Sequence, residues 1–375
     1  MKDDLLHIPL IDHHCHAIVD EGRKGDVEAL IRVTSEAPSS YSLFDLKQRP
    51  IWHAVKTIVR RYTGGEFIND DELAYVLRQQ DYKAYCRSLF NDSRYQALYI
   101  DTGYSPASAL TLEKLADLTD IDIYPILRIE SLAENEFESR KTFSEWWESV
   151  LYQIKAARES GYIGAKSIAA YRSGLSLYRV SSEAAKESFE RWKKSGANRL
   201  TEGDVLNFLV WNAAPVLAEQ SLPLQFHTGY GDPDTDLRLG NPLLLRDFIE
   251  TFTPNGLSVV LLHCYPYHRE AGYLSSVYDN VFFDTSLILP LGLSSARRVV
   301  AEALELAPYS RYLFASDAHT RPEMFALAAE LFRDAFAFHL EDPLMKHYTS
   351  GETRENWAKH VFQLNSKKLY FGIDN

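Results

Sequence analysis

The chain has 375 residues, of which 46% are hydrophobic, 13% aromatic and 25% charged. This composition is typical of a globular protein with a large core, and it excludes a disordered chain, a collagen-like repeat and a disulfide scaffold. Lysine and arginine number 40 against 52 aspartate and glutamate residues, which gives a net charge of −12. Because such a surface repels phosphate backbones, we expect a small-molecule substrate and no nucleic-acid partner.

The cysteine content and the N-terminal segment bear on the compartment. Three cysteines, an odd number, are too few for a disulfide framework and fit a reducing environment. Met1–His7 contains no apolar region of signal-peptide length, and no apolar run is long enough to span a bilayer. We therefore predict a cytoplasmic protein without a membrane partner; assembly into a homo-oligomer stays open.

Short apolar runs alternate along the chain with longer amphipathic segments. Continuous runs of this kind are typical of parallel strands that are buried on both faces. The segments between them have helical periodicity, as at Trp146, Trp147, Val150, Leu151 and Ile154. Repeated strand–helix alternation predicts an α/β protein, specifically a (β/α)8 TIM barrel. The eight predicted strands are Ile8–Asp12, Gln96–Ile100, Ile121–Leu127, Tyr162–Lys166, Leu222–His227, Leu257–His263, Val281–Asp284 and Tyr312–Ala315.

Two insertions interrupt the alternation. The longer one, about residues 25–92, follows the first predicted strand and has helical patterns at Ile51–Tyr62 and Asp70–Leu89. The second, roughly Tyr171–Leu200, follows the fourth strand, and a helical extension is expected at about residues 340–375. Because the chain has no low-complexity tract or linker, we predict a single domain over residues 1–375.

Residues of metal-ligand type follow several predicted strands. His14 and His16 are two residues apart at the end of the first strand, so on extended backbone their side chains point to the same side. His227 and His263 end the fifth and sixth strands, and Asp317 follows the eighth. A TIM barrel builds its active site at the carboxyl ends of its strands. Four imidazoles and a carboxylate there match the ligands preferred by zinc and similar divalent ions.

Other residues near these strand ends are less informative. A single histidine at a strand end is more often a hydrogen-bonded structural residue than a ligand, and only the whole set predicts a metal site. His13 has the opposite parity to His14, so we expect it to face the barrel wall. Cys15 also has the wrong parity for a ligand, and Cys264 is expected to be a small packing residue.

The Asp12-x-His14-x-His16 motif, followed by Lys166, His227, His263 and Asp317 at strand ends, resembles the metal-dependent amidohydrolase superfamily. The resemblance covers about residues 8–320. Gly164–Arg172 and His263–Tyr267 further resemble the "amidohydrolase 2" branch. That branch includes stand-alone bacterial hydrolases and a barrel fused to a glutamine-synthetase-like domain. Because the sequence ends at Asn375, we expect a stand-alone relative without the fused domain.

The resemblance implies a set of metal ligands. His14 and His16 would bind one metal with Asp317, while His227 and His263 would bind a second. Lys166 stands where relatives with two metals carry a carboxylated lysine. An ammonium beside two cations is disfavoured, so Lys166 should lose its proton and can then add carbon dioxide. The expected cofactor is a divalent metal, two zinc ions with Mn, Fe or Ni as alternatives; a one-metal site with unmodified Lys166 stays open.

The resemblance also implies a reaction. We expect a metal-bound hydroxide to hydrolyse an amide, lactone or related C–N or C–O bond in a small anionic metabolite. Asp317 would be the catalytic residue that takes the proton and passes it to the leaving group; the alternative role is ligand only. A metal-dependent lyase such as a decarboxylase, or a sugar-acid isomerase, is the alternative on the same barrel. A non-catalytic metal-binding protein is the third.

Substrate contacts are harder to predict. Arg172, six residues beyond Lys166, can clamp a carboxylate with two hydrogen bonds. Arg128 ends the third strand and is a second candidate, unless it pairs with Glu130 or Asp101. Tyr230 and Tyr267 follow metal-ligand strands and either orient a polar substrate or form an aromatic wall. His268 and His319 either act as acid or base or are simply loop or helix-start residues.

Overall fold

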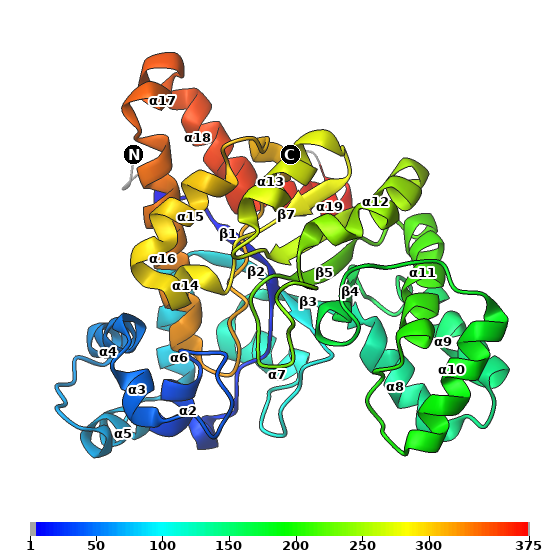
Figure 1. Ribbon diagram of the computed structural model, residues 1–375. Helices are drawn as coiled ribbons and strands as arrows, with labels where there is room; N and C mark the ends of the chain where they lie inside the picture. The colour runs from blue at the N-terminus through cyan, green and yellow to red at the C-terminus, as the bar shows by residue number, and fades with distance from the viewer. Residues whose placement is uncertain (1–4, 374–375) are drawn as a thin grey trace.

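The computed structural model describes residues 5–373, in which seven parallel strands form one curled sheet in chain order (Figure 1). Every strand pairs in parallel with the next, and helices follow the strands along the chain. The predicted TIM-barrel architecture is confirmed. The strands are β1 (Leu10–Cys15), β2 (Tyr95–Asp101), β3 (Asp122–Arg128), β4 (Gly164–Ser167), β5 (Leu224–Thr228), β6 (Val259–His263) and β7 (Val281–Phe283).

The eighth predicted strand, Tyr312–Ala315, is not a regular strand. The Leu313 amide donates to the carbonyl of Phe283 in β7 (3.0 Å), and the His13 amide of β1 donates to the carbonyl of Phe314 (3.1 Å). This segment therefore lies between β7 and β1 and closes the barrel with isolated hydrogen bonds. The pairing stays short because the chain soon turns at Asp317, where φ is 54°.

The insertion after β1 folds into five helices. Its first helical pattern corresponds to α4 (Pro50–Thr63), which ends at Gly64 in a left-handed conformation (φ 64°). The second pattern is interrupted, because the Asp81 side chain caps a new helix by accepting from the Ala84 amide. The other insertion helices are α2 (Val27–Arg32), α3 (Leu43–Lys47), α5 (Asp70–Arg78) and α6 (Tyr82–Asp92).

A second group of helices lies on the opposite side of the barrel from α2–α5 (Figure 1). Aromatic side chains pack these helices against one another: the rings of Phe137 and Trp192 stack with centroids 3.6 Å apart, and Trp146 is fully buried. The group consists of α8 (Ile129–Ser139), α9 (Phe143–Lys155), α10 (Ser182–Ser195) and α11 (Gly203–Glu219). The two helical groups therefore flank the barrel from two sides.

The remaining helices cover the barrel or extend beyond it. They are α7 (Leu112–Thr119), α12 (Arg246–Phe252), α13 (His268–Val277), α14 (Ile288–Gly292), α15 (Ala296–Ala303) and α16 (Pro322–Leu340). The C-terminal extension consists of α17 (Pro343–Tyr348), α18 (Gly351–Lys359), a π-helical turn (His360–Leu364) and α19 (Asn365–Phe371). Short 3₁₀ helices occur at Glu21–Arg23, Ala169–Tyr171, Pro242–Leu245, Thr253–Asn255, Leu293–Ser295 and Tyr309–Arg311.

The two ends of the barrel interior differ in chemistry. Apolar and aromatic residues fill the end that lies toward the start of the strands, where Ile11, Tyr99, Ile126 and Ile163 pack around Tyr370 of α19. Polar residues gather at the carboxyl ends of the strands, among them His14, which is fully buried. This contrast places the candidate site at the carboxyl ends.

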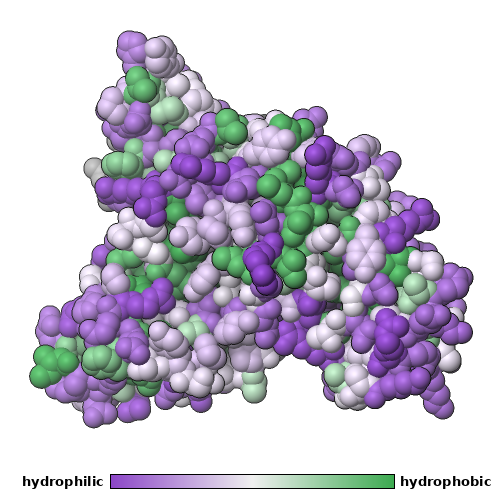
Figure 2. Space-filling model, in the orientation of Figure 1, coloured by the Kyte–Doolittle hydropathy of each residue, from purple (hydrophilic) through white to green (hydrophobic). Residues whose placement is uncertain are grey.

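The surface is not uniform in hydropathy. Figure 2 shows hydrophilic side chains over the right-hand edge of this face, where α10 lies, and apolar side chains toward its centre. Within residues 5–373, no helix combines the length and the apolar character needed to cross a membrane.

Candidate metal centre

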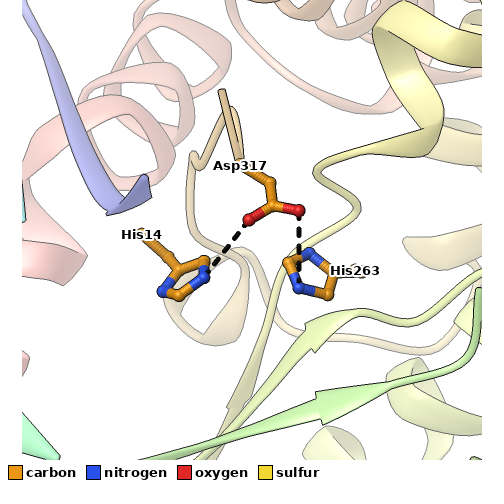
Figure 3. A group of neighbouring side chains, drawn as sticks. All are labelled: His14, His263 and Asp317. Atoms are coloured by element: carbon orange, nitrogen blue, oxygen red, sulfur yellow. Dashed lines mark ion pairs between the residues drawn. The ribbon is translucent and has the colours of Figure 1, made fainter. Parts of the chain in front are cut away.

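Three side chains from distant parts of the chain meet at the carboxyl ends of the strands (Figure 3). One Asp317 carboxylate oxygen lies 3.3 Å from His14 Nε2, and the other lies 3.7 Å from His263 Nε2. His16 Nε2 is 3.4 Å from the same carboxylate. β1 supplies His14 and β6 supplies His263, whereas Asp317 follows the segment that closes the barrel. The structure therefore brings together four of the six predicted ligands, with three histidines around the Asp317 carboxylate.

The backbone is strained where two of these residues leave the sheet. His263 and Asp317 have φ values of 67° and 54°, and Cys264 has 63°. A non-glycine residue in the left-handed region costs on the order of 1–3 kcal/mol and persists only when its surroundings enforce it. At His263, this conformation ends β6 at a residue whose ring nitrogen lies 3.7 Å from Asp317. Such strain is commonly found at functional sites.

Hydrogen bonds orient the rings of His14 and His263. His14 Nδ1 donates to Gln225 Oε1 (2.9 Å), and His263 Nδ1 donates to Ser286 Oγ (2.7 Å). With the proton on Nδ1, a neutral imidazole has its lone pair on Nε2, the atom that faces Asp317. Bonds of this kind fix the tautomer and orientation of metal-binding histidines.

Burial determines the charge of these groups. It lowers the pKa of His14 to about 3 and also lowers the pKa of His263 and His227, because each ring is removed from solvent. Burial alone would raise the pKa of Asp317, but the neighbouring His263 and His14 outweigh it and hold this pKa well below its ordinary value. The Asp317 carboxylate and the Nε2 atoms of His14, His16 and His263 thus lie within 3.3–3.7 Å of one another as a cluster of ligand-type atoms. A divalent cation is the group that fits this arrangement.

Lys166 extends from β4 into the same cluster. It is 2% exposed, and its Nζ lies 3.2 Å from His14 Nε2. Burial lowers the pKa of this amine to about 8. A substantial fraction of the amine is therefore neutral near physiological pH, which is the reactive form.

His16 and His227 each have one buried ring nitrogen without a hydrogen-bond partner among the described residues, Nδ1 and Nε2 respectively. Such orphaned buried atoms are rare in folded proteins, and they are expected where a ligand, ion or water binds. The His227 ring lies beside those of Tyr171 and His263, with centroids 4.1 and 4.6 Å away. His227 is thus adjacent to the cluster but outside the compact group formed by His14, His263 and Asp317.

A cavity of about 760 Å³ surrounds these residues. Its wall includes all six predicted ligands and both predicted arginines: His14, His16, Lys166, His227, His263, Asp317, Arg128 and Arg172. The insertion contributes Arg32 and Glu36, while the second excursion contributes Arg199. Cavities of this size bind small molecules.

The two predicted substrate arginines differ in how they are paired. Arg128 makes a two-pronged ion pair with Asp101, with distances of 2.6 and 3.0 Å. This is the pairing that the sequence left open as the alternative to substrate binding. Arg172 is 8% exposed and bonds Glu134 through one nitrogen at 3.2 Å. Its Nε is buried without a partner among residues 5–373. Arg172 therefore retains a free donor, whereas Asp101 already occupies the fork of Arg128.

The predicted tyrosines do not line this cavity. Tyr267 donates its hydroxyl to the Leu237 carbonyl at the surface (3.0 Å), because the chain turns into α13 at this point. The Tyr230 amide donates to the Tyr265 carbonyl in the loop after β5, and this residue too is absent from the cavity wall. Tyr104 and Tyr171 line the cavity instead.

The three neighbouring histidines also have clear places. His268 bonds Glu302 (2.8 Å) at the start of α13, in agreement with the helix-start alternative, while His319 lines the cavity. The expectation for His13 was wrong: its ring lies inside the barrel, with Nε2 3.0 Å from Asp284 Oδ2. The pairing of β1 with β2 shifts register between Asp12 and Cys15, so simple alternation fails there.

Sequence reasoning missed several residues of the site. Asp101 forms a second compact group with His14 and His16, and its place at the end of β2 was an available signal. Glu36 lines the cavity from the insertion, and burial together with the charge of Asp317 raises its pKa to about 7. No sequence pattern marks Glu36, because its place depends on how the insertion folds.

A parallel barrel with imidazole and carboxylate side chains gathered at its strand ends is typical of metal-dependent barrel proteins. Residues 182–372 match the amidohydrolase family (Amidohydro_2). The chain belongs to this family, which confirms the resemblance seen in the sequence.

Individual relatives agree with this membership. Protein fluG of Emericella nidulans is 32% identical over 281 residues, which are 65% of this chain and 32% of the relative. The chain thus spans about a third of the length of that curated relative. A solved structure from Lactobacillus casei ATCC 334, provisionally described as a metal-dependent hydrolase, is 40% identical with a TM-score of 0.93. That match covers 99% of this chain and 97% of the other.

A more distant structure shares the fold alone. The uronate isomerase of Thermotoga maritima is 15% identical with a TM-score of 0.70, over 99% of this chain and 96% of the isomerase. The same barrel therefore carries proteins of different described activity. Fold alone does not choose between them.

Proposed function

We propose that this protein is a metal-dependent hydrolase that cleaves an amide, lactone or related C–N or C–O bond in a small anionic metabolite. The observation that carries the proposal is the Asp317 carboxylate lying 3.3 Å from His14 Nε2 and 3.7 Å from His263 Nε2 in the wall of the cavity. The Lactobacillus casei relative, described provisionally as a metal-dependent hydrolase, supports the same class of reaction.

The ligands proposed for two zinc ions, with Mn, Fe or Ni as alternatives, are His14, His16, Lys166, His227, His263 and Asp317. Such ions, when bound, acidify a water molecule and polarise the scissile carbonyl. Lys166 takes part as a carbamate: its neutral amine forms a bond to the carbon of carbon dioxide and releases a proton. Its burial, its lowered pKa and its position 3.2 Å from His14 support this modification.

The chain's own residues supply the remaining chemistry. The ionised Asp317 carboxylate accepts the proton of the attacking water and passes it to the leaving amine or alkoxide. Arg172, whose buried Nε lacks a partner among the described residues, binds a carboxylate of the substrate and orients it. The cavity of about 760 Å³, whose wall also includes Arg32 and Arg199, has the size of a small-molecule site.

One observation favours a different reaction on the same barrel. The compact group contains only His14, His263 and Asp317, and His227 lies outside it. Three ligands suit a single ion beside an unmodified Lys166, which is the arrangement expected for a lyase such as a decarboxylase or for a sugar-acid isomerase. A non-catalytic metal-binding role is disfavoured, because the candidate ligands line a large cavity.

Metal content per chain separates these proposals. The protein is prepared without chelator from medium supplemented with zinc and measured by elemental analysis. Near two equivalents support the hydrolase, whereas near one equivalent favours the lyase or isomerase. Protein that is folded and binds no metal in this medium contradicts both.

The carbamate has a separate test. Lys166→Ala should lose metal and activity together, and short carboxylic acids added with metal should partly restore both by filling the vacated space. Lys166→Arg keeps the space filled and should not respond to the acids. An unmodified amine in the electron density of a fully metallated, active enzyme at near-neutral pH would contradict the proposal.

A further inference from the structure

Beneath the candidate metal centre, buried polar side chains continue away from both histidines toward the start of the strands. On one side, His14 Nδ1 bonds Gln225 Oε1 (2.9 Å), and Gln225 Nε2 donates to the Tyr370 hydroxyl (2.7 Å). On the other side, His263 Nδ1 bonds Ser286 Oγ (2.7 Å), which donates to Asp284 Oδ1 (2.6 Å). Each arm starts at a candidate ligand and ends deeper in the barrel.

His13 joins the two arms into one network. Its Nε2 lies 3.0 Å from Asp284 Oδ2, and its Nδ1 lies 3.2 Å from the Tyr370 hydroxyl. His13, Gln225 and Asp284 are fully buried, and Ser286 and Tyr370 are each 1% exposed. Water therefore has little access to these groups, and each depends on its protein partners for hydrogen bonds.

On the Asp284 side of the network, the hydrogen bonds point toward this carboxylate. This carboxylate accepts from the amides of His263 and Ser286, both at 2.8 Å, as well as from the Ser286 hydroxyl. Because it can only accept, His13 must carry its proton on Nε2. On the other side of the ring, His13 Nδ1 lies within hydrogen-bond distance of the Tyr370 hydroxyl (3.2 Å).

Hydrogen bonds also determine which ring nitrogen of His14 and His263 carries the proton. The Gln225 amide nitrogen donates to the His13 carbonyl and to the Tyr370 hydroxyl, so the carbonyl oxygen of Gln225 faces His14 and requires a proton on His14 Nδ1. The Ser286 hydroxyl donates to Asp284, so its oxygen accepts from His263 Nδ1. Both histidines are thereby held with free lone pairs on Nε2, the form that binds a metal ion.

We propose that Tyr370 of the C-terminal helix α19 is a positioning residue of the metal centre, whose hydroxyl closes the network that joins His14 to His263. The inference rests on the proposed metal site. It assigns α19, a helix outside the strand–helix repeats, a role in holding two ligands from β1 and β6. Without the hydroxyl, the His13 Nδ1 and one hydrogen of the Gln225 amide lose their partner. The Gln225 side chain then keeps only its bonds to His14 Nδ1 and to the His13 carbonyl, both 2.9 Å.

Tyr370 also has a packing role, which the experiment must separate from the hydroxyl. Its ring packs against Tyr99 with centroids 4.9 Å apart, and a Cβ on Gly164 would lie 3.0 Å from it. Tyr370→Phe keeps the ring and removes only the hydroxyl. Tyr99→Phe is the matched control, because it removes a hydroxyl from the same cluster and no hydrogen bond of that hydroxyl occurs among residues 5–373.

The affinity for Zn²⁺ is measured by competition with a chelator, and the visible spectrum is recorded after substitution with Co²⁺. We expect Tyr370→Phe to weaken Zn²⁺ binding about 10–100-fold, the usual effect of losing an outer-shell partner, and to shift the Co²⁺ spectrum. Tyr99→Phe should remain within about twofold of the wild type. The melting temperature of each metal-free variant verifies that both are folded.

A double variant tests the route of the effect. Because Gln225→Leu breaks the link to His14, Tyr370→Phe should weaken Zn²⁺ binding less in that background than in the wild type. Equal affinity of Tyr370→Phe and the wild type, or equal weakening by Tyr370→Phe and Tyr99→Phe, overturns the positioning role and leaves the proposed function intact. A wild-type protein that binds no Zn²⁺ overturns the proposed function itself, and this inference with it.

Discussion

The two ends of the barrel interior, formed by the same strands, differ in packing and backbone strain. At the carboxyl ends, His263 and Asp317 have strained backbone, and His16 has a ring nitrogen without a partner in the described part of the chain. At the other end, Ile126 and Tyr370 pack in a closed cluster of apolar and aromatic residues. The site is therefore held ready for a ligand at a cost in stability, which the packed end offsets.

The polar layer between these two ends connects them. Gln225 and Asp284 bond both to the ligands above and to His13 below. Precise placement of functional groups requires neighbours that are themselves locked by packing and hydrogen bonds. Variants at the carboxyl ends should therefore change metal binding and activity, while variants at the packed end should change stability.

The largest effect is expected from removing a ligand. His14→Ala or His263→Ala should abolish metal binding and reduce activity by more than the 10–100-fold that an outer-shell partner costs, while circular dichroism reports a retained fold. His347→Ala, an exposed histidine on α17, is the control. Wild-type metal content in both ligand variants would refute the assignment.

Asp317→Asn should have the next largest effect. The amide cannot accept a proton, so turnover should fall by about 10²–10⁴-fold while at least one metal stays bound. Steady-state kinetics and metal analysis of the same preparation measure both quantities. The exposed Asp247→Asn serves as the control. Turnover within about twofold of the wild type would exclude the proton-transfer role.

Ile126→Ala tests the packed end. This fully buried side chain lies in the cluster around Tyr370, and its truncation should lower the free energy of unfolding by about 2–5 kcal/mol. Metal content should not change, because no ligand contacts are lost. Ile68→Ala, at a side chain that is 92% exposed, should change the stability little. Loss of metal without loss of stability would contradict the division between the two ends.

Arg172→Lys tests whether Arg172 binds a carboxylate of the substrate. Lysine keeps the charge but cannot reproduce the planar fork, so KM should rise about 10-fold with a smaller change in kcat. The control is Arg238→Lys, whose side chain is 88% exposed and pairs with Asp236 at the surface. Once a substrate is identified, an unchanged KM would exclude Arg172 as the carboxylate clamp and direct attention to Arg128.

The smallest effect concerns pH and Glu36. Burial raises the pKa of Glu36 to about 7, so between its ordinary value of 4.5 and 7 the folded state holds a proton that the unfolded state has released. The stability of the metal-free protein should therefore fall as pH rises through this window, with this group contributing up to about 1.4 kcal/mol per pH unit. Glu36→Gln should remove that contribution, while Glu66→Gln, 90% exposed, should not. Parallel pH profiles of the wild type and Glu36→Gln would contradict the shift.

Strand–helix periodicity and the position of ligand-type residues were predictable from the sequence. Apolar runs mark buried parallel strands, and a barrel gathers the carboxyl ends of all its strands at one end. His14, His227 and His263 could therefore be placed together without coordinates. The eighth strand was overpredicted, because periodicity does not register the turn at Asp317 that cuts the pairing short.

Only the tertiary structure decided which of these residues approach each other and what surrounds them. The register shift in β1 turned His13 into the barrel, and the pairing of Arg128 with Asp101 left Arg172 as the arginine with a free donor. Glu36 and Tyr370 reach the site region from an insertion and from the C-terminal helix. Their positions depend on long-range packing between segments hundreds of residues apart, whereas periodicity reports only contacts within a few residues of one another along the chain.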